Sequence, residues 1–79
     1  MTHDVIFETV KRNVLAVLPD VEPGQISIDG KLSDLGANSV DRADVVTLTM
    51  EDLGVTIPIT EFQDVSDLRS LVTVLEKHA

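Results

Sequence analysis

The sequence predicts an all-α fold: a small four-helix bundle, with three main helices, one short helix and a long ordered loop between the first two. Apolar residues recur at intervals of three and four in three segments, which is the spacing of one helical face. Every proline and glycine falls outside those segments. Residues 26–28 alternate as a strand would, but no partner strand is evident, so we assign them to the loop.

Composition limits the fold to one modest core. The chain has 79 residues, so we expect a single domain over 1–79. Hydrophobic residues make up 43% and aromatic residues 3%, so the core must consist of Val, Leu and Ile. The chain has no cysteine, which excludes disulfides and thiolate metal sites. Any thiol chemistry must therefore come from an added group.

The charge of the chain points to basic protein surfaces as partners. A formal net charge of −8 would repel nucleic acid and anionic membranes. The N-terminus has no basic region followed by an apolar run, and no window approaches the length of a membrane span. We expect a monomeric cytoplasmic protein. Because the chain begins with Met1 and ends just after its last predicted helix, we also expect it to be free-standing.

The first helix is predicted over residues 4–18. Thr2 is its expected N-cap, and Pro19 stops it. Glu8, Lys11 and Arg12 lie off the apolar face and are read as a solvated surface. That face consists of Phe7, Val10, Val14 and Val17, widened by Ile6, Leu15 and Leu18.

The loop over residues 19–37 is longer than most connections, so its own apolar side chains must hold it to the core. Ile26, Ile28, Leu32 and Leu35 are the expected anchors. Pro23-Gly24 and Asp29-Gly30 supply its turns.

The second helix is predicted over residues 39–53, with Asn38 or Ser39 as its cap and Gly54 as its stop. One apolar stripe consists of Ala43, Val46, Met50 and Leu53, flanked by Val45 and Leu48. The polar face consists of Asp41, Asp44, Glu51 and Asp52, with Arg42 as its one basic residue.

The rest of the chain is predicted as an extended segment and two helices. Residues 55–58 are β-branched before a proline and should be extended. A short helix is expected over 59–64, anchored by Phe62. Ser66 is the expected cap of the last helix, with Asp67 in its first turn. The predicted core is Phe7, Val10, Val14, Val46, Leu53, Leu68, Leu71 and Leu75.

Ser39 is the one residue whose position suggests chemistry. A hydrolytic serine needs an adjacent base, but the only histidines, His3 and His78, are at the two ends of the chain. The acidic residues are dispersed, so no metal site is predicted. A serine at a helix start is usually only a cap. A phosphate on Ser39 would nevertheless lie at the positive end of the helix.

The run Leu35-Gly36-Ala37-Asn38-Ser39-Val40-Asp41, the acidic helix after it and Leu53-Gly54-Val55-Thr56-Ile57-Pro58 resemble the acyl carrier protein family. The resemblance covers nearly the whole chain. It implies a non-enzymatic carrier whose Ser39 bears 4'-phosphopantetheine, added by a phosphopantetheinyl transferase, and holds acyl groups as thioesters. The sequence has Asn38 where the family usually has Asp, and Val40 where it usually has Leu. Asn38 can still cap a helix, and Val40 is still apolar.

A narrower resemblance concerns residues 38–42 and 47–51. They are similar to discrete carriers of bacterial polyketide pathways, and especially to donor carriers of β-branching cassettes. That likeness implies acyltransferase, ketosynthase or HMG-synthase-like enzymes as partners. The alternatives are a fatty-acid or D-alanyl carrier, or a small acidic binding protein in which Ser39 is only a cap.

The exposed face of the second helix is the expected docking surface. Val40, Asp41, Asp44 and Glu51 can share a face that leads away from Ser39. Glu51 and Asp52 lie near the C-terminal end of the helix, where the dipole disfavours anions. We interpret this lack of structural benefit as a sign of function. Arg42 is expected to add specificity at the same edge.

Overall fold

The structure is a computed structural model that describes residues 2–79. Its helices are α1 (His3–Val17), α2 (Ser39–Leu53) and α3 (Leu68–His78). Three short 3-10 helices, η1 (Pro23–Gln25), η2 (Leu32–Leu35) and η3 (Ile59–Phe62), lie between them. Within the described residues there is no strand, which confirms the all-α prediction and the reading of residues 26–28 as loop. The predicted short helix forms, but as a 3-10 helix that ends two residues early.

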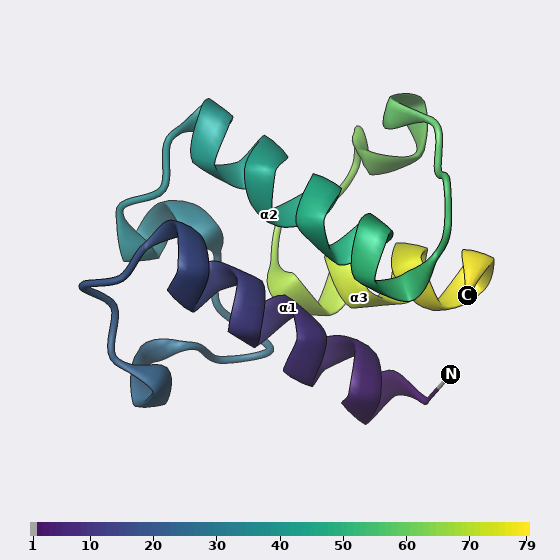
Figure 1. Ribbon diagram of the computed structural model, residues 1–79. Helices are drawn as coiled ribbons and strands as arrows, with labels where there is room; N and C mark the ends of the chain where they lie inside the picture. The colour runs from purple at the N-terminus through teal and green to yellow at the C-terminus, as the bar shows by residue number, and fades with distance from the viewer. Residues whose placement is uncertain (1) are drawn as a thin grey trace.

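The three α-helices enclose one hydrophobic core. Figure 1 shows α1 and α2 running in opposite directions, with α3 behind them and the chain ends on the same side. α1 packs against both other helices. Fully buried side chains from all three helices meet between them, and Ile26, Leu32, Ala37 and Ile57 from the connections complete the core. No helix in residues 2–79 has the length and apolar content that a membrane crossing requires.

α1 begins as predicted, with the Thr2 side chain accepting a hydrogen bond from the Val5 amide at 3.3 Å. Ile6, Val10 and Val14 are fully buried. Phe7, which was predicted to face inward, packs against the core but is only partly buried. Lys11 lies over the outer side of this ring, with its ammonium nitrogen 5.0 Å from the ring centroid.

The long loop is held to the core and also completes the start of α3. Ile26 and Leu32 are buried, and Ile28 and Leu35 are partly buried, which confirms all four predicted anchors. The carbonyl oxygens of Ile28 and Gly30 accept hydrogen bonds from the amides of Arg69 at 2.7 Å and Leu68 at 2.9 Å. These amides belong to the first helical turn, which has no partners within its own helix. The loop is therefore ordered by polar as well as apolar contacts.

The N-cap of α3 is Asp67, which corrects the prediction of Ser66. The Asp67 carboxylate accepts a hydrogen bond from the Ser70 amide at 2.8 Å. The Ser70 hydroxyl in turn accepts from the amides of Asp67 and Ser66, each at 3.1 Å. Both candidates are good caps by residue type, so only the backbone geometry decides between them. Leu68, Leu71, Val72 and Leu75 are buried as predicted.

The face of α2 that enters the core differs from the prediction. Val45 and Thr49 are fully buried, whereas the predicted core residues Val46 and Leu53 are only partly buried and Ala43 is exposed. The predicted stripe lies beside the buried one, because α2 packs on α1 with one side and faces the η3 segment with the next. Gly54 ends the helix in the left-handed conformation at φ 69°, as predicted.

A polar network joins α1 to α2 where the sequence suggested only solvated charges. The Asn13 amide group donates hydrogen bonds to the Thr49 hydroxyl and to the Asp52 carboxylate, both at 3.0 Å. Arg12 also donates to Asp52, at 3.3 Å. Asn13 and Thr49 are buried. Asp52 therefore has a structural role, which corrects its reading as a functional acid, and Arg12 is not a purely solvated residue.

The Asp52 contacts predict how stability depends on pH. Hydrogen bonds from Asn13, and then from Arg12, lower the Asp52 pKa below its usual 3.8. A carboxylate with a depressed folded-state pKa stabilises the fold above its unfolded-state pKa, and that stabilisation is lost as pH falls through the folded value. Asp52→Asn should therefore have a lower melting temperature than the parent at pH 7. The difference between the two melting temperatures should become smaller below pH 3.8. Thermal melts from pH 7 to pH 2, with Glu51→Gln as the control, measure this. A difference in melting temperature that stays constant from pH 7 to pH 2 would contradict a stabilising role of the ionised Asp52.

Candidate functional site at the start of α2

The turn before α2 places Ser39 at the surface. Gly36 ends η2 in the left-handed conformation, at φ 89°, which favours glycine. The next amide, that of Ala37, donates to the Leu32 carbonyl oxygen at 3.2 Å, and the Ala37 side chain is buried. The chain then turns outward, so Asn38, Ser39 and Val40 are all exposed.

The cap of α2 is Asn38, and Ser39 is the first helical residue. The Asn38 side chain accepts a hydrogen bond from the Asp41 amide at 2.8 Å, and the Asp41 carboxylate accepts one from the Asn38 amide at 3.2 Å. This reciprocal pair is a capping box. It leaves the Ser39 hydroxyl without a hydrogen bond within residues 2–79. The helix start is as predicted, but capping does not occupy the Ser39 oxygen.

Within residues 2–79, neither histidine lies beside Ser39 to act as a base for its hydroxyl. His3 lies at the start of α1, where its Nδ1 is 3.4 Å from the Glu76 carboxylate, and His78 ends α3. In the part of the chain that the structure describes, no three histidine or acidic side chains form a group that could hold a metal ion. Ser39 is therefore an exposed serine at a helix start with no histidine beside it among the described residues.

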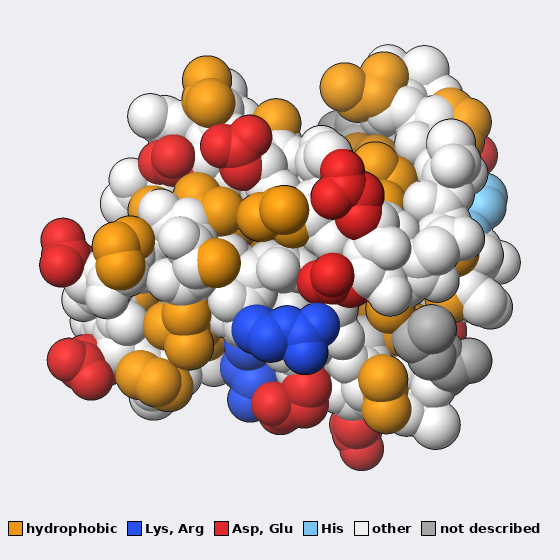
Figure 2. Space-filling view, viewed as in Figure 1, with side chains coloured by type: hydrophobic (Ala, Val, Ile, Leu, Met, Phe, Trp, Pro, Cys, Tyr) orange, Lys and Arg blue, Asp and Glu red, His pale blue; other side chains and the backbone are white. Residues whose placement is uncertain are grey.

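A groove opens beside Ser39, between α2 and the segment that carries η3. Its volume is about 470 Å³. Figure 2 shows the surface hollowed there, with hydrophobic side chains at the hollow. Its polar lining residues are Ser39, Arg42, Thr47 and Gln63, and its apolar lining residues are Leu32, Ala43, Val46, Met50, Ile57, Ile59, Phe62, Val65 and Leu71. Ala43, Val46 and Met50 belong to the apolar stripe that was predicted to face the core, so the groove could not be predicted from the sequence.

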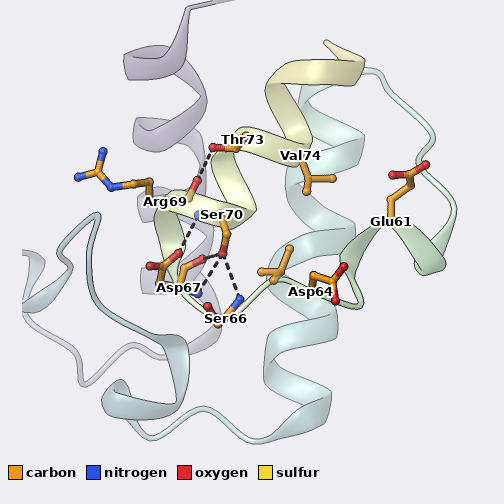
Figure 3. A pocket seen from close by; sticks show the side chains of 9 residues that line it. Glu61, Asp64, Ser66, Asp67, Arg69, Ser70, Thr73 and Val74 are labelled. Atoms are coloured by element: carbon orange, nitrogen blue, oxygen red, sulfur yellow. Dashed lines mark hydrogen bonds between the residues drawn. The ribbon is translucent and has the colours of Figure 1, made fainter.

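A second cavity, of about 460 Å³, lies between η3 and α3. Asp67, Ser70 and Thr73 in its lining have hydrogen-bond partners, and Glu61 and Asp64 are exposed carboxylates (Figure 3). Asp67, Ser66 and Ser70 bond to one another at the start of α3. The hydrogen bond from the Ser70 backbone is the main cause that lowers the Asp67 pKa. This cavity is therefore part of the α3 cap, and it offers no chemistry comparable to Ser39.

The outward face of α2 is acidic, with an apolar residue at its start. Val40 is 67% exposed, and Asp44 and Glu51 are exposed on the same side. Asp41 is half-buried and committed to the capping box. Of the acids predicted for docking, Asp44 and Glu51 are therefore the two whose carboxylates are not used in the fold.

Comparisons with known proteins agree on one family. Residues 8–75 match the family model described as a phosphopantetheine attachment site. The chain is 39% identical to the polyketide biosynthesis acyl-carrier-protein AcpK of Bacillus subtilis, covering 95% of this chain and 92% of that protein. It is also 35% identical to an acyl carrier protein of Campylobacter hominis, covering 90% of each chain.

A solved structure gives the same result. One chain of the crystal structure of the curacin biosynthetic pathway HMG synthase in complex with acetyl donor-ACP superimposes with a TM-score of 0.86. The two chains are 25% identical, and the match covers 95% of this chain and 96% of that one. The matched chain is therefore about the size of this one, as a carrier protein would be.

Proposed function

The chain belongs to the acyl carrier protein family, whose members carry a phosphopantetheine arm and are not enzymes, and we propose that Ser39 is the residue that bears the arm here. The observation that carries this proposal is the capping box. Because Asn38 and Asp41 cap α2, the exposed Ser39 hydroxyl is left uncommitted at the helix start. A phosphopantetheinyl transferase would supply the missing base.

The loading step accounts for the thiol chemistry that the chain lacks. The Ser39 oxygen forms a bond to the β-phosphorus of coenzyme A, the adenosine bisphosphate leaves, and the serine proton passes to the transferase. The product is a phosphodiester with a thiol-tipped arm. Since the chain has no cysteine, that thiol would be the only one present, and acyl groups would be held on it as thioesters.

We further propose that the carrier serves polyketide biosynthesis and donates an acetyl group to an HMG-synthase-like enzyme. The likeness to a polyketide carrier and to an acetyl donor carrier supports this. The likeness to plain acyl carrier proteins keeps a fatty-acid carrier as the second candidate. Because the chain belongs to the acyl carrier protein family, the alternative of a small acidic binding protein, with Ser39 only a cap, has no remaining support. Four expectations stay predictions: a cytoplasmic location, a monomeric state, a single domain over residues 1–79, and the other partner enzymes.

Acetyl transfer tests the pathway proposal. The chain loaded with acetyl-phosphopantetheine should lose its acetyl group to an HMG-synthase-like enzyme, which intact-mass spectrometry detects as an acetylated enzyme. An acetyl-loaded fatty-acid carrier, used at the same concentration, should transfer more slowly. Equal rates for the two carriers would contradict a dedicated donor role and favour the fatty-acid assignment.

The acidic face of α2 should govern how fast such partners associate. Rim charges act mainly on association rate and salt dependence. Changing Asp44 and Glu51 together to Lys should slow acetyl transfer about tenfold or more at low salt, because steering commonly changes on-rates by factors of 10 to 10³. The difference should shrink as salt screens the charges.

The matched control changes Asp4 and Glu76 to Lys. Both are exposed acids that lie on α1 and α3 near the chain ends, away from the start of α2 (Figure 1), and the exposed contact between Glu76 and His3 that the change removes should contribute little to stability. The two variants have the same net charge. If both slow transfer equally, only net charge matters and the proposed docking face is wrong.

A further inference from the structure

The basic side chains of this acidic protein divide into two groups. The chain has six Lys and Arg residues. Three of them form ion pairs: Lys11 with Glu8, Arg12 with Asp52 and Arg69 with Asp29. Among residues 2–79, no carboxylate lies within ion-pair distance of Arg42, although Asp41 and Asp44 are close to it in sequence. Arg42 is therefore an exposed cation with no internal partner.

The position of Arg42 relates it to Ser39. The two residues are three apart on α2, and residues at that spacing are neighbours on a helix surface. Both line the groove between α2 and the η3 segment. Arg42 also borders a small adjoining cleft together with Lys31, a second basic residue outside the ion pairs. Among the described residues, Arg42 is the one charged residue that lines the groove together with Ser39, whereas Asp44 and Glu51 are exposed outside that lining.

From this placement, and resting on Ser39 as the attachment site, we propose that the Arg42 guanidinium holds the phosphodiester of the arm. A guanidinium presents parallel N–H donors that match the oxygens of a phosphate. The phosphodiester adds negative charge to a chain whose net charge is already −8, at a helix that carries four acids. Pairing with Arg42 offsets that repulsion.

The pairing has a directional consequence. Because Arg42 lines the groove, it would draw the first atoms of the arm toward the groove and away from the acidic docking face. Arg42 is thus a positioning residue that sets where the arm departs from the protein. Lysine would keep the charge without the planar fork, so Arg42→Lys should retain part of the effect.

The test compares the arginine side-chain Nε–Hε signals of the apo and loaded protein by NMR at slightly acidic pH. The chain contains three arginines, and Arg12 and Arg69 are already paired with carboxylates. Loading should shift the Arg42 signal and leave the other two in place. No shift of Arg42, or equal shifts of all three, would overturn the proposal.

The ³¹P signal of the loaded protein provides the second measurement. Arg42→Gln should move this signal, Arg42→Lys should move it less, and Arg69→Gln should leave it as in the parent. An unchanged signal in loaded Arg42→Gln would overturn the proposal even if the Arg42 resonance moved, because Arg42 would then sense the arm without holding its phosphate. Intact mass confirms loading beforehand. Absence of loading would overturn the assignment of Ser39 and this proposal with it, whereas loading without either shift overturns this proposal alone.

Discussion

Ser39→Ala is expected to abolish loading completely. The variant has no oxygen at the attachment point, and the other serines lack this position at the start of α2. After incubation with coenzyme A and a broad-specificity phosphopantetheinyl transferase, intact-mass spectrometry should find the parent fully loaded and the variant unmodified. Ser33→Ala is the matched control, because Ser33 is another exposed serine on the segment that leads into α2. That variant should load like the parent.

The loss of loading in Ser39→Ala should not result from unfolding, because Ser39 is not the residue that caps α2. Since Asn38 provides the capping side chain, Ser39→Ala removes no hydrogen bond within the described fold. It should change stability by less than about 0.5 kcal/mol. Asn38→Ala should cost about 1 kcal/mol through the lost cap. Loading of Ser39→Ala would refute the assignment, and a lower melting temperature than that of Asn38→Ala would refute the capping account.

Val45→Asp is expected to be the most destabilising single change on α2. Val45 is fully buried against the core, so the variant would place a carboxylate there without a partner. An uncompensated buried charge costs about 3–5 kcal/mol. The total stability of a small domain is only about 5–15 kcal/mol, and 79 residues suggest the lower part of that range. The variant should therefore lose most of its cooperative thermal transition.

Val46→Asp is the matched comparison, because it makes the same chemical change one residue later. Val46 is partly buried and lines the groove, so its carboxylate can reach water. It should cost about 1 kcal/mol, which is typical of point mutations. Thermal melts of the two variants distinguish the structure from the sequence-based prediction, which placed Val46 in the core. Greater destabilisation by Val46→Asp would show that the face of α2 is assigned wrongly here.

The sequence predicted the helices well because local signals define them. Proline and glycine lie between the helices, and the stripes of α1 and α3 fall at helical spacing. Gly54 was predicted from its position alone, and its φ of 69° confirms it. The exact cap of α3 was not predictable, since Ser66 and Asp67 are adjacent and both suit the role.

The face of α2 could not be predicted, because the helix has contacts on two sides. Its apolar residues form a broad band, and the centre of the buried face includes Thr49, which is polar by type. Thr49 tolerates burial because its hydroxyl donates to the Val45 carbonyl at 2.7 Å and accepts from Asn13. Asn13 lies 36 residues away in the sequence, so no pattern within α2 reveals this partner. The same reason explains the mistaken reading of Asp52.

The position of Ser39 at the start of α2 was predictable from the sequence, but the hydrogen-bonding state of its hydroxyl was not. The turn, the helix start and Ser39 all followed from the sequence around Gly36 and Asn38. The free state of the Ser39 hydroxyl follows only from the Asn38–Asp41 capping box, and the groove only from the approach of the η3 segment to α2.

The central claim is that the protein holds acyl groups as thioesters on an arm at Ser39, and one mass measurement tests it. The transferase and acetyl-coenzyme A should add a single acetyl-phosphopantetheine to each chain, and neutral hydroxylamine should then remove only the acetyl group. Since the chain has no cysteine, a hydroxylamine-sensitive acetyl group must be on the added arm. An unchanged mass, or an acetyl group that resists hydroxylamine, would contradict the claim.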